Sequence, residues 1–277
     1  MQVFVTGASG FVGNEVVKEL LDRGHQVKAL VRPGSEKKLQ ERDRVEVVRG
    51  DCLHPETFAP ALEGCDAAIH LVGIIREFPG RGITFERVHV EATRNVVDAA
   101  RAASLRRYLH MSALGARPEP ADPYHVTNWQ ADEYVITSGL TYTIFRPSII
   151  YGPGDQSLNL FARQIRRLPF FPIMELPHTE NKIYEVGGPE PLTFNDIIDT
   201  IAFVLGRRVA KIHQPVWCMR VAASLCGRFR WFPLTPGQLR MLLEGNTCDP
   251  SAFYQDFGLK PIPFREGLAT YLSSARP

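Results

Sequence analysis

The chain has 277 residues, of which 44% are hydrophobic and 22% are charged. This composition excludes a disordered tail protein, a collagen-like fibre and a small disulfide-rich protein, and it provides enough chain for a large α/β domain with a smaller lobe. With 32 basic and 30 acidic residues the formal net charge is +2, so we expect no nucleic-acid partner on the ground of overall charge.

Short apolar runs alternate with helical patterns in the first half of the chain. The predicted strands are Val3–Val5, Val27–Val31, Val45–Val48, Ala67–Val72, Tyr108–Met111 and Thr141–Phe145. The predicted helices are Asn14–Arg23, Phe85–Ala103 and Tyr124–Thr137. Strands and helices alternating at this spacing predict a doubly wound α/β fold, in which helices cover both faces of a parallel sheet.

Proline and glycine become dense after Pro147, which indicates a second part of the chain. There, Thr193 is a candidate cap for a helix over Phe194–Leu205, and we predict a short strand at Val209–His213 and a helix over Leu239–Leu243. We therefore place the main domain at residues 1–150 and a smaller C-terminal lobe at 151–277, some of whose segments return to the main sheet.

The start of the chain and its apolar stretches indicate where the protein is located, and its histidines and cysteines indicate whether it binds a metal ion or forms disulfides. We expect no signal or transit peptide, because a strand-like segment begins at the first residues. No stretch reaches the roughly 18 apolar residues of a membrane span, so we expect a cytoplasmic protein, with peripheral association at the inner face of a membrane as the alternative. Histidine spacings typical of zinc ligands are absent from the sequence, and we expect no metal site. Reduced thiols are expected at Cys52, Cys65, Cys218, Cys226 and Cys248.

A glycine-rich loop links the first predicted strand to the first helix. Its spacing is GxxGxxG, from Gly7 to Gly13. Glycines there permit a tight turn, let the backbone approach a pyrophosphate and let the helix N-terminus face it, as in Rossmann-type domains. A glycine-rich turn without ligand is the alternative, and the strand–turn–helix context favours nucleotide binding. We expect cofactor contacts at Gly7, Ser9, Gly10, Phe11, Val12 and Gly13.

Cofactor choice depends on the residue about 20 positions beyond the glycines, where an NAD-binding chain usually has an acidic residue. Here that position is Arg32, with Lys37 soon after. A guanidinium can bind a 2′-phosphate through two hydrogen bonds, so we predict NADP(H) over NAD(H), with a solvated charged loop as the alternative. Asp51, beside Cys52, is a candidate acceptor for the adenine amino group or an N-cap for the Pro55 region.

Eight segments in chain order carry a family resemblance: TGASGFVG, GDC, HLVGIIRE, ATRNVVDAA, HMSALGA, YHVTN, FRPSIIYGPGD and YEVGGPE. Together they resemble the extended and atypical short-chain dehydrogenase/reductase superfamily, and within it the NAD-dependent epimerase/dehydratase-like proteins. Within it, the chain is most similar to the nucleotide-binding accessory subunit of respiratory complex I and its bacterial relatives. The resemblance implies that residues 1–150 form an NADP(H)-binding Rossmann domain and that the C-terminal lobe lies over the nicotinamide.

Site residues follow from the same resemblance. It assigns the catalytic tyrosine to Tyr124 and the serine that closes the fifth strand to Ser112. Tyr124 is also an expected ribose contact. Further cofactor contacts are implied at Leu71, Val72, Gly73, Pro147, Ser148 and Ile149.

One departure from the family concerns the catalytic pair Tyr-x-x-x-Lys, because Asn128 occupies the lysine position. Only about one free tyrosine in a thousand is ionised at pH 7, and the lysine charge normally favours the phenolate. Asn128 supplies no charge, and a neighbouring cation such as His125 is the possible substitute. Tyr124 is then a weak acid/base, a ribose contact or a packed helix residue.

A second departure lies between Phe170–Ile173 and residues 184–187, where relatives carry an additional strand and helix. The segment is either deleted from this protein or missing from this chain. In both cases the sequence does not define the wall of the site that faces a substrate, and we therefore predict no substrate residue.

Residues 216–232 interleave aromatic and arginine side chains around an apolar helix. Our first interpretation is that these residues pack in the core of the lobe. The second is that they contact a membrane surface, and a further one is that they bind in a groove of a partner protein.

Two functions are thus compatible with the sequence. The first is an NADP(H)-dependent oxidoreductase or sugar-nucleotide epimerase/dehydratase-like enzyme in which Tyr124 exchanges a proton with an unidentified small-molecule substrate and Ser112 orients it. The second is a non-catalytic NADP(H)-binding scaffold or assembly subunit of a respiratory-type complex, with a protein partner. Asn128 favours the second function, and the retained Tyr124 favours the first.

Overall fold

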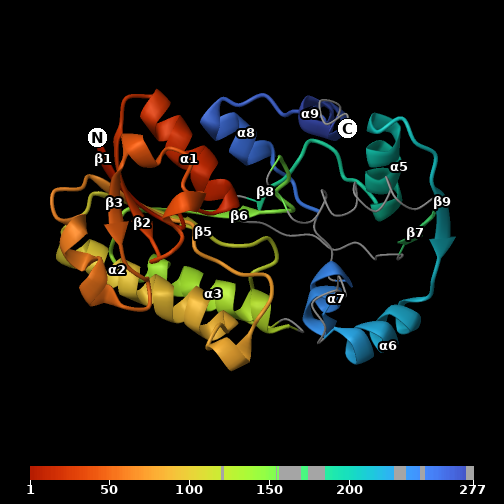
Figure 1. Cartoon of the computed structure of the whole chain (residues 1–277), viewed down its shortest axis with the longest axis horizontal. Coiled ribbons are helices and arrows are strands. Elements are labelled where there is room, and N and C mark those ends of the chain that lie inside the picture. Colours follow the sequence, from red (N-terminus) through yellow and green to blue (C-terminus); the bar gives the residue numbers. More distant parts are fainter. Residues whose placement is uncertain are drawn as a thin grey trace. The chain divides into compact units, whose positions relative to one another are not determined.

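The computed structural model describes residues 1–119, 122–153, 155, 170–173, 185–227, 235–243 and 247–272 (Figure 1). It comprises two compact units, Met1–Arg146 and Pro147–Pro277. Most of the predicted cofactor contacts lie within the first unit.

Parallel strands form the centre of the first unit. Their order is β3-β2-β1-β4-β5-β6, and β8 (Glu185–Val186) extends the sheet to seven strands. The order reverses between β1 and β4, and in such sheets ligands bind outside the carboxyl ends of the strands at the reversal. The strands are β1 (Gln2–Thr6), β2 (Gln26–Val31), β3 (Glu46–Arg49), β4 (Ala67–His70), β5 (Arg107–Met111) and β6 (Tyr142–Pro147).

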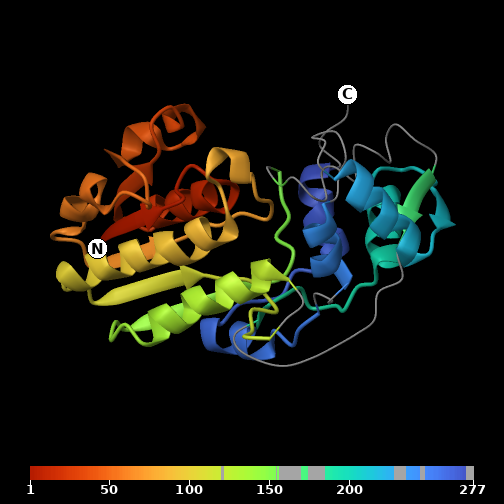
Figure 2. The ribbon, with the colours of Figure 1, turned by 90° about the horizontal axis from the view of Figure 1, so that it is seen from below.

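Helices cover both faces of this sheet, which confirms the predicted doubly wound fold. In Figure 1, α1 (Phe11–Asp22) lies on the face opposite α2 (Ala92–Ala102) and α3 (Pro123–Ile136). Figure 2 shows α2 and α3 running side by side. Short 3-10 helices connect these elements at Glu36–Lys38, Arg42–Arg44, Pro55–Thr57, Ala59–Leu62 and Pro79–Arg81.

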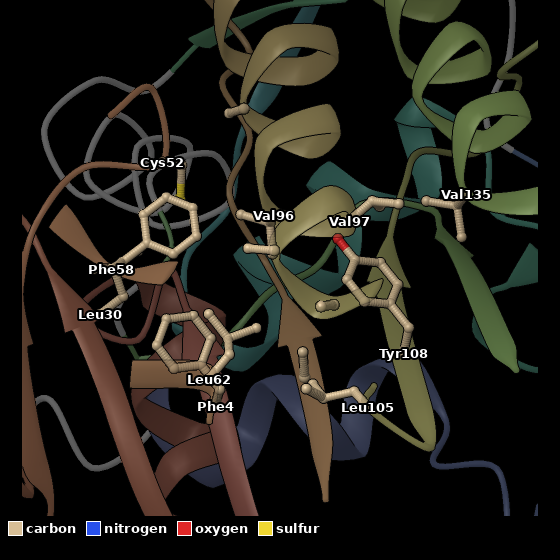
Figure 3. Packing of buried hydrophobic residues seen from close by; sticks show 14 of the residues in the cluster. Phe4, Leu30, Cys52, Phe58, Leu62, Val96, Val97, Leu105, Tyr108 and Val135 are labelled. Atoms are coloured by element: carbon tan, nitrogen blue, oxygen red, sulfur yellow. The ribbon is translucent and has the colours of Figure 1, made fainter. Parts of the chain in front are cut away.

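The alternation of side chains along β1 creates two cores. Val3 and Val5 pack on the same side as Val17 of α1, and Phe4, which points the other way, stacks on Phe58 at 6.1 Å. Figure 3 shows this second cluster between the sheet and α2. Burial on both faces is why the central strands β1 and β4 read as continuous apolar runs.

The predicted single helix over Phe85–Ala103 is divided in the structure. A π-helical segment at Glu86–Glu91 precedes α2. Side-chain periodicity does not reveal the one extra residue per turn of a π-helix, so the sequence could not distinguish the two. Such turns are frequent at functional sites, and His89 on this segment reaches the site described below.

The second unit is mainly helical. Its α5 begins with a capping box in which the Thr193 side chain accepts from the Asp196 backbone N–H, as the sequence predicts. Ile198 and Ile201 of α5 pack against Leu268 of α9. Its elements are the parallel pair β7 (Phe170–Ile173) and β9 (Ala210–His213), with α5 (Phe194–Val204), α6 (Val216–Cys226), α7 (Pro236–Leu243), α8 (Ser251–Phe257) and α9 (Phe264–Leu272).

Residues 174–184, where the family would carry its additional strand and helix, lie outside the described residues. Within the described ranges, no helix is both long and apolar enough to span a bilayer. The same ranges contain no cluster of three or more His, Cys, Asp or Glu side chains able to hold a metal ion.

Candidate functional site

In the glycine loop after β1, the backbone packs closely against the start of α1 and against the segment that follows β4. Gly7 has a φ of +69°, and a Cβ there would lie 3.0 Å from the backbone of Leu71. A Cβ at Gly13 would lie 2.1 Å from the carbonyl oxygen of Gly7. Side chains at either position would therefore displace the loop, so the glycines are needed for this conformation.

The N-terminus of α1 offers donors to an anion. The N-cap residue is Gly10, which has no side chain to accept a hydrogen bond from the first N–H groups of the helix. No acidic residue occupies the first turn. Backbone N–H groups in the first turn of a helix have no partner within the helix, and the helix dipole adds positive potential there. Phe11, Val12 and Gly13 supply these groups, so the cradle fits the pyrophosphate of a dinucleotide.

Asn14 is a site residue that the sequence reasoning missed. It is 8% exposed, and its amide nitrogen donates to the carbonyl oxygens of Gly10 and Lys38, each at 3.0 Å. Its oxygen accepts from the N–H of Gln40 at 2.8 Å. Asn14 thereby joins the glycine loop to the basic segment after β2. Its position directly after Gly13 is the one signal in the sequence that could have indicated this role.

Arg32 follows β2 at the same edge of the sheet as the glycine loop. Its side chain is exposed, and no ion pair of its guanidinium is recorded among the residues described. The nearby acid Glu36 instead pairs with Arg49 at 3.2 Å. Lys37 is exposed on the following 3-10 helix. Both cations thus lie where the sequence places a 2′-phosphate contact.

Asp51 and Cys52 follow β3. The Asp51 carboxylate accepts from the N–H of Leu53 at 3.0 Å, and His54, rather than Asp51, is the N-cap of the Pro55 helix, so the capping alternative is wrong. Cys52 is buried in the core, where desolvation raises the pKa of its thiol to about 12. Its backbone carbonyl oxygen accepts from Asn95 at 2.9 Å.

Tyr124 lies in the first turn of α3 among aromatic rings. Its ring contacts Phe85, His89 and His125 edge-on, with centroids 5.6, 5.4 and 5.3 Å away. Burial, together with the nearby carboxylate of Asp122, raises the pKa of the Tyr124 phenol to about 12. The environment therefore disfavours the phenolate that proton transfer would require.

Asn128 lies one helical turn beyond Tyr124, at the position of the family lysine. Its side-chain nitrogen donates to the backbone carbonyl oxygen of Tyr124 at 2.8 Å and lies 3.3 Å from Nδ1 of His89. Burial lowers the pKa of His89 to about 4, so this imidazole is neutral at pH 7. The residues that contact Asn128 here supply no positive charge.

His89 also links α3 to the loop after β4. Its Nδ1 lies 2.9 Å from the hydroxyl of Thr127, and its Nε2 lies 3.0 Å from the carbonyl oxygen of Ile74. Leu71, Val72 and Gly73 precede this contact. The expected ribose segment is thus held beside Tyr124 and Asn128 through one histidine that sequence reasoning assigned no role.

His125 was the candidate cation that could replace the lysine. Its Nδ1 lies 2.7 Å from the Asp122 carboxylate, which also accepts from the N–H groups of Tyr124 and His125. These contacts make Asp122 the N-cap of α3. Because that carboxylate lies beside His125, the pair brings no net positive charge to the phenol.

Ser112 closes β5, but its hydroxyl is directed into the protein. It donates to the Asp132 carboxylate at 2.9 Å, and the Arg146 guanidinium binds the same carboxylate at 2.7 Å. Desolvation raises the pKa of Asp132 to about 6 despite these partners. With its proton committed to Asp132, Ser112 offers a substrate only acceptor lone pairs.

Two buried histidines lie beneath this region. His70 lies 2.7 Å from the hydroxyl of Thr6 and 3.2 Å from that of Thr93, as expected of a satisfied core residue. His110 stacks on His70 at 5.5 Å, yet no hydrogen bond of its ring nitrogens is recorded among the described residues. The closest ionisable partner recorded for it is Asp132 at 3.5 Å.

Pro147, Ser148 and Ile149 belong to the second unit. There the Ser148 N–H donates to the carbonyl oxygen of Val186 at 2.9 Å, and Ile149 is 39% exposed. The structure thus brings the glycine loop, Arg32, Tyr124 and the other first-unit contacts into one α/β unit, and the expected nicotinamide segment begins at Pro147, the last residue of β6.

Comparison with known proteins agrees with a dinucleotide-binding site at the glycine loop. A family model described as NAD(P)H-binding matches residues 7–163. Ceramide reductase of Caulobacter vibrioides is 33% identical over 173 residues, which are 62% of this chain and 53% of that protein. NADH dehydrogenase (ubiquinone) 1 alpha subcomplex subunit 9 of Dictyostelium discoideum is 27% identical over 71% of this chain and 62% of that protein. The matches therefore cover less than two thirds of both relatives.

Solved structures resemble the fold over its whole length. UDP-glucose 4-epimerase of Thermus thermophilus, solved in complex with NAD, superposes with a TM-score of 0.71 at 19% identity and full coverage of both chains. At this identity the likeness concerns the fold.

Proposed function

Because the chain belongs to the NAD(P)H-binding family, within the extended short-chain dehydrogenase/reductase superfamily, we propose that it holds NADP(H) as a structural ligand and performs no tyrosine–lysine proton transfer. One observation carries this proposal. Asn128 stands at the lysine position, and its amide is engaged with the Tyr124 carbonyl oxygen at 2.8 Å.

The electrostatics around the phenol support a non-catalytic role. A pKa of about 12 for Tyr124 leaves about one molecule in a hundred thousand ionised at pH 7. The neutral imidazole of His89 does not offset this, and the Asp122 carboxylate opposes ionisation. A protein that retains the phosphate cradle without a charged partner for its tyrosine is suited to bind a dinucleotide and leave it unchanged.

The preference for NADP(H) rests on Arg32 and Lys37. NADP(H) differs from NAD(H) by a 2′-phosphate, which a guanidinium binds through charge-assisted hydrogen bonds. Asn14 supports this choice because its bond to Lys38 holds the basic segment against the glycine loop. When bound, the dinucleotide supplies hydride chemistry, while the residues of this chain bind its phosphates and orient its ribose.

The similarity to a mitochondrial NADH dehydrogenase subunit supports a place in a multiprotein assembly. In such a role the bound nucleotide stabilises the fold of the first unit. A ligand at a hundred times its Kd raises the free energy of unfolding by about 2.7 kcal/mol, so NADP(H) at that concentration lowers the unfolded fraction about a hundredfold.

Thermal unfolding with NADPH, NADH and UDP-glucose at matched concentrations tests the proposal. We expect NADPH to raise the Tm most, and Tyr124→Phe to retain that stabilisation. The bound NADPH should remain reduced when carbonyl compounds and sugar nucleotides are added. Absence of any nucleotide effect would contradict cofactor binding. Consumption of NADPH that is lost in Tyr124→Phe would contradict the non-catalytic role.

That last outcome describes the second candidate function, an oxidoreductase or epimerase-like enzyme. It is favoured by the retained tyrosine, which lies in the first turn of α3 and is partly exposed, and by the similarity to a protein named ceramide reductase. In that case Tyr124 would donate its proton from the neutral phenol, and its high pKa would make it a weak acid whose phenolate is rarely present to act as a base.

A further inference from the structure

We propose that the outer face of α6 binds the surface of an anionic lipid bilayer. Three apolar side chains at four-residue spacing lie exposed along this helix. Trp217 is 66% exposed, Val221 is 51% exposed and Leu225 is 67% exposed. Residues four apart lie on one helix face, so the three form a continuous apolar stripe of about 12 Å.

The stripe is not the inner face of the helix. Ala223 is buried and, with Met219, packs against Leu239 and Leu242 of α7. The predicted core packing of this helix is thus correct for one face only. Large exposed apolar groups gathered on one face of a monomer indicate an interaction surface rather than a core.

Charge identifies the partner. From Thr200 to Leu243 the sequence contains basic residues and no Asp or Glu, although the whole chain has a net charge of only +2. Arg220 is exposed on α6 itself, and Lys211 is paired with Asp199. Arg228 and Arg230, which follow the helix in sequence, lie outside the described residues. The basic residues of this stretch are Arg207, Arg208, Lys211, Arg220, Arg228, Arg230 and Arg240.

An apolar stripe with Arg220 on the same helix, in a stretch of sequence that lacks acidic residues, is the pattern of a helix that lies in the plane of a membrane interface. Tryptophan favours the depth of the lipid headgroups, because its ring is apolar and its N–H is polar. Basic side chains are attracted by anionic headgroups, and each one near the surface strengthens binding roughly fivefold. An acidic protein groove would match the charge as well, but it would not require an exposed tryptophan.

Co-sedimentation of the full chain with lipid vesicles tests this proposal. We expect binding to vesicles of phosphatidylcholine containing about one third phosphatidylglycerol, weakening with added salt, and little binding to phosphatidylcholine alone. Arg220→Gln should weaken binding roughly fivefold. The double variant Trp217→Ser/Leu225→Ser should weaken it by more than tenfold, since both residues lose apolar contact with the bilayer.

A matched control separates the stripe from general hydrophobicity. Leu259 and Ile262 are 51% and 62% exposed elsewhere in the second unit, so Leu259→Ser/Ile262→Ser should bind vesicles like the native chain. Equal vesicle binding by the two double variants would overturn the proposal, as would absence of binding to anionic vesicles. A dimer that Trp217→Ser/Leu225→Ser dissociates, in a chain that ignores vesicles, would assign the stripe to a second copy and also overturn it.

Discussion

The side-chain amide of Asn14 donates a hydrogen bond to the backbone carbonyl oxygen of Lys38, 3.0 Å away. This bond connects the glycine-rich turn, which we propose holds the cofactor phosphates, to the basic segment that we propose binds the 2′-phosphate. The side chain of Asn14 is engaged with the backbone of Gly10, Lys38 and Gln40, so under this proposal it is a positioning residue for both segments.

Replacing Asn14 by Leu should weaken NADPH binding more than NADH binding. The variant leaves the carbonyl oxygens of Gly10 and Lys38 without this donor, which costs about 1–3 kcal/mol of stability when such groups are buried. Calorimetric titration with both nucleotides measures the difference. Asn95→Leu is the control, since Asn95 also donates to a backbone carbonyl, that of Cys52. Equal weakening of NADPH and NADH by Asn14→Leu would show that the bond does not position the basic segment.

Arg32→Ala should reduce the affinity for NADPH by about 10- to 100-fold, because a hydrogen bond to a charged group contributes about 1.5–3 kcal/mol. NADH lacks the 2′-phosphate and should bind unchanged. Fluorescence titration of the two reduced nucleotides gives both constants. Arg23→Ala, which removes an exposed arginine from the end of α1, should alter neither. Arg32 has no 2′-phosphate role if NADPH binds Arg32→Ala at native affinity.

Gly13→Ala should abolish stabilisation by any dinucleotide. The new Cβ would lie 2.1 Å from the carbonyl oxygen of Gly7, so the loop must move, at a cost of about 1–3 kcal/mol in unfolding free energy. Gly80→Ala is the matched control, because nothing lies within 4 Å of a Cβ at that position. Thermal unfolding with and without NADPH measures both effects, and a native response in Gly13→Ala would refute the cradle.

Asn128→Lys should lower the pKa of Tyr124 from its value of about 12, by about one to three units, because an ammonium group favours the phenolate. Tyrosinate absorbance against pH, compared with Asn128→Lys/Tyr124→Phe, isolates this phenol from the other tyrosines. A gain of turnover in Asn128→Lys would indicate a catalytic pair that has lost its charge. A lowered pKa with no turnover and native NADPH binding would support the structural role.

Acid should destabilise the first unit through His70. Burial lowers the pKa of this imidazole to about 3 from 6.5, so between these pH values the unfolded chain binds a proton that the folded chain does not. The group's contribution is fully present above pH 6.5 and is lost as the pH falls toward 3, by up to about 1.4 kcal/mol per pH unit. Urea unfolding of His70→Gln should show a correspondingly smaller slope of stability against pH.

The exposed His54 gives the control for that experiment. His54→Gln removes an exposed imidazole in place of a buried one, so it is the matched substitution in the same urea experiment. If His70→Gln shows the same slope as His54→Gln, the acid sensitivity has another origin, such as His110.

Sequence alone was sufficient for the fold and for the close backbone packing of the glycine loop, because both depend on local patterns. Apolar strands buried on two faces read as continuous runs, and the glycines from Gly7 to Gly13 are required by a backbone approach that the strand–turn–helix order already implies. The exchange of lysine for Asn128 was equally visible, since helical spacing places it beside Tyr124.

Contacts between distant segments were decided by the tertiary structure. His89 reaches Ile74 and Asn128 from a π-helical segment whose extra residue leaves no clear trace in apolar periodicity. Ser112 turns toward Asp132 because the buried Arg146 holds that carboxylate there. Residue type and spacing identify which side chains gather at a site, whereas burial and the neighbours in space determine their charge and the direction of each hydrogen bond.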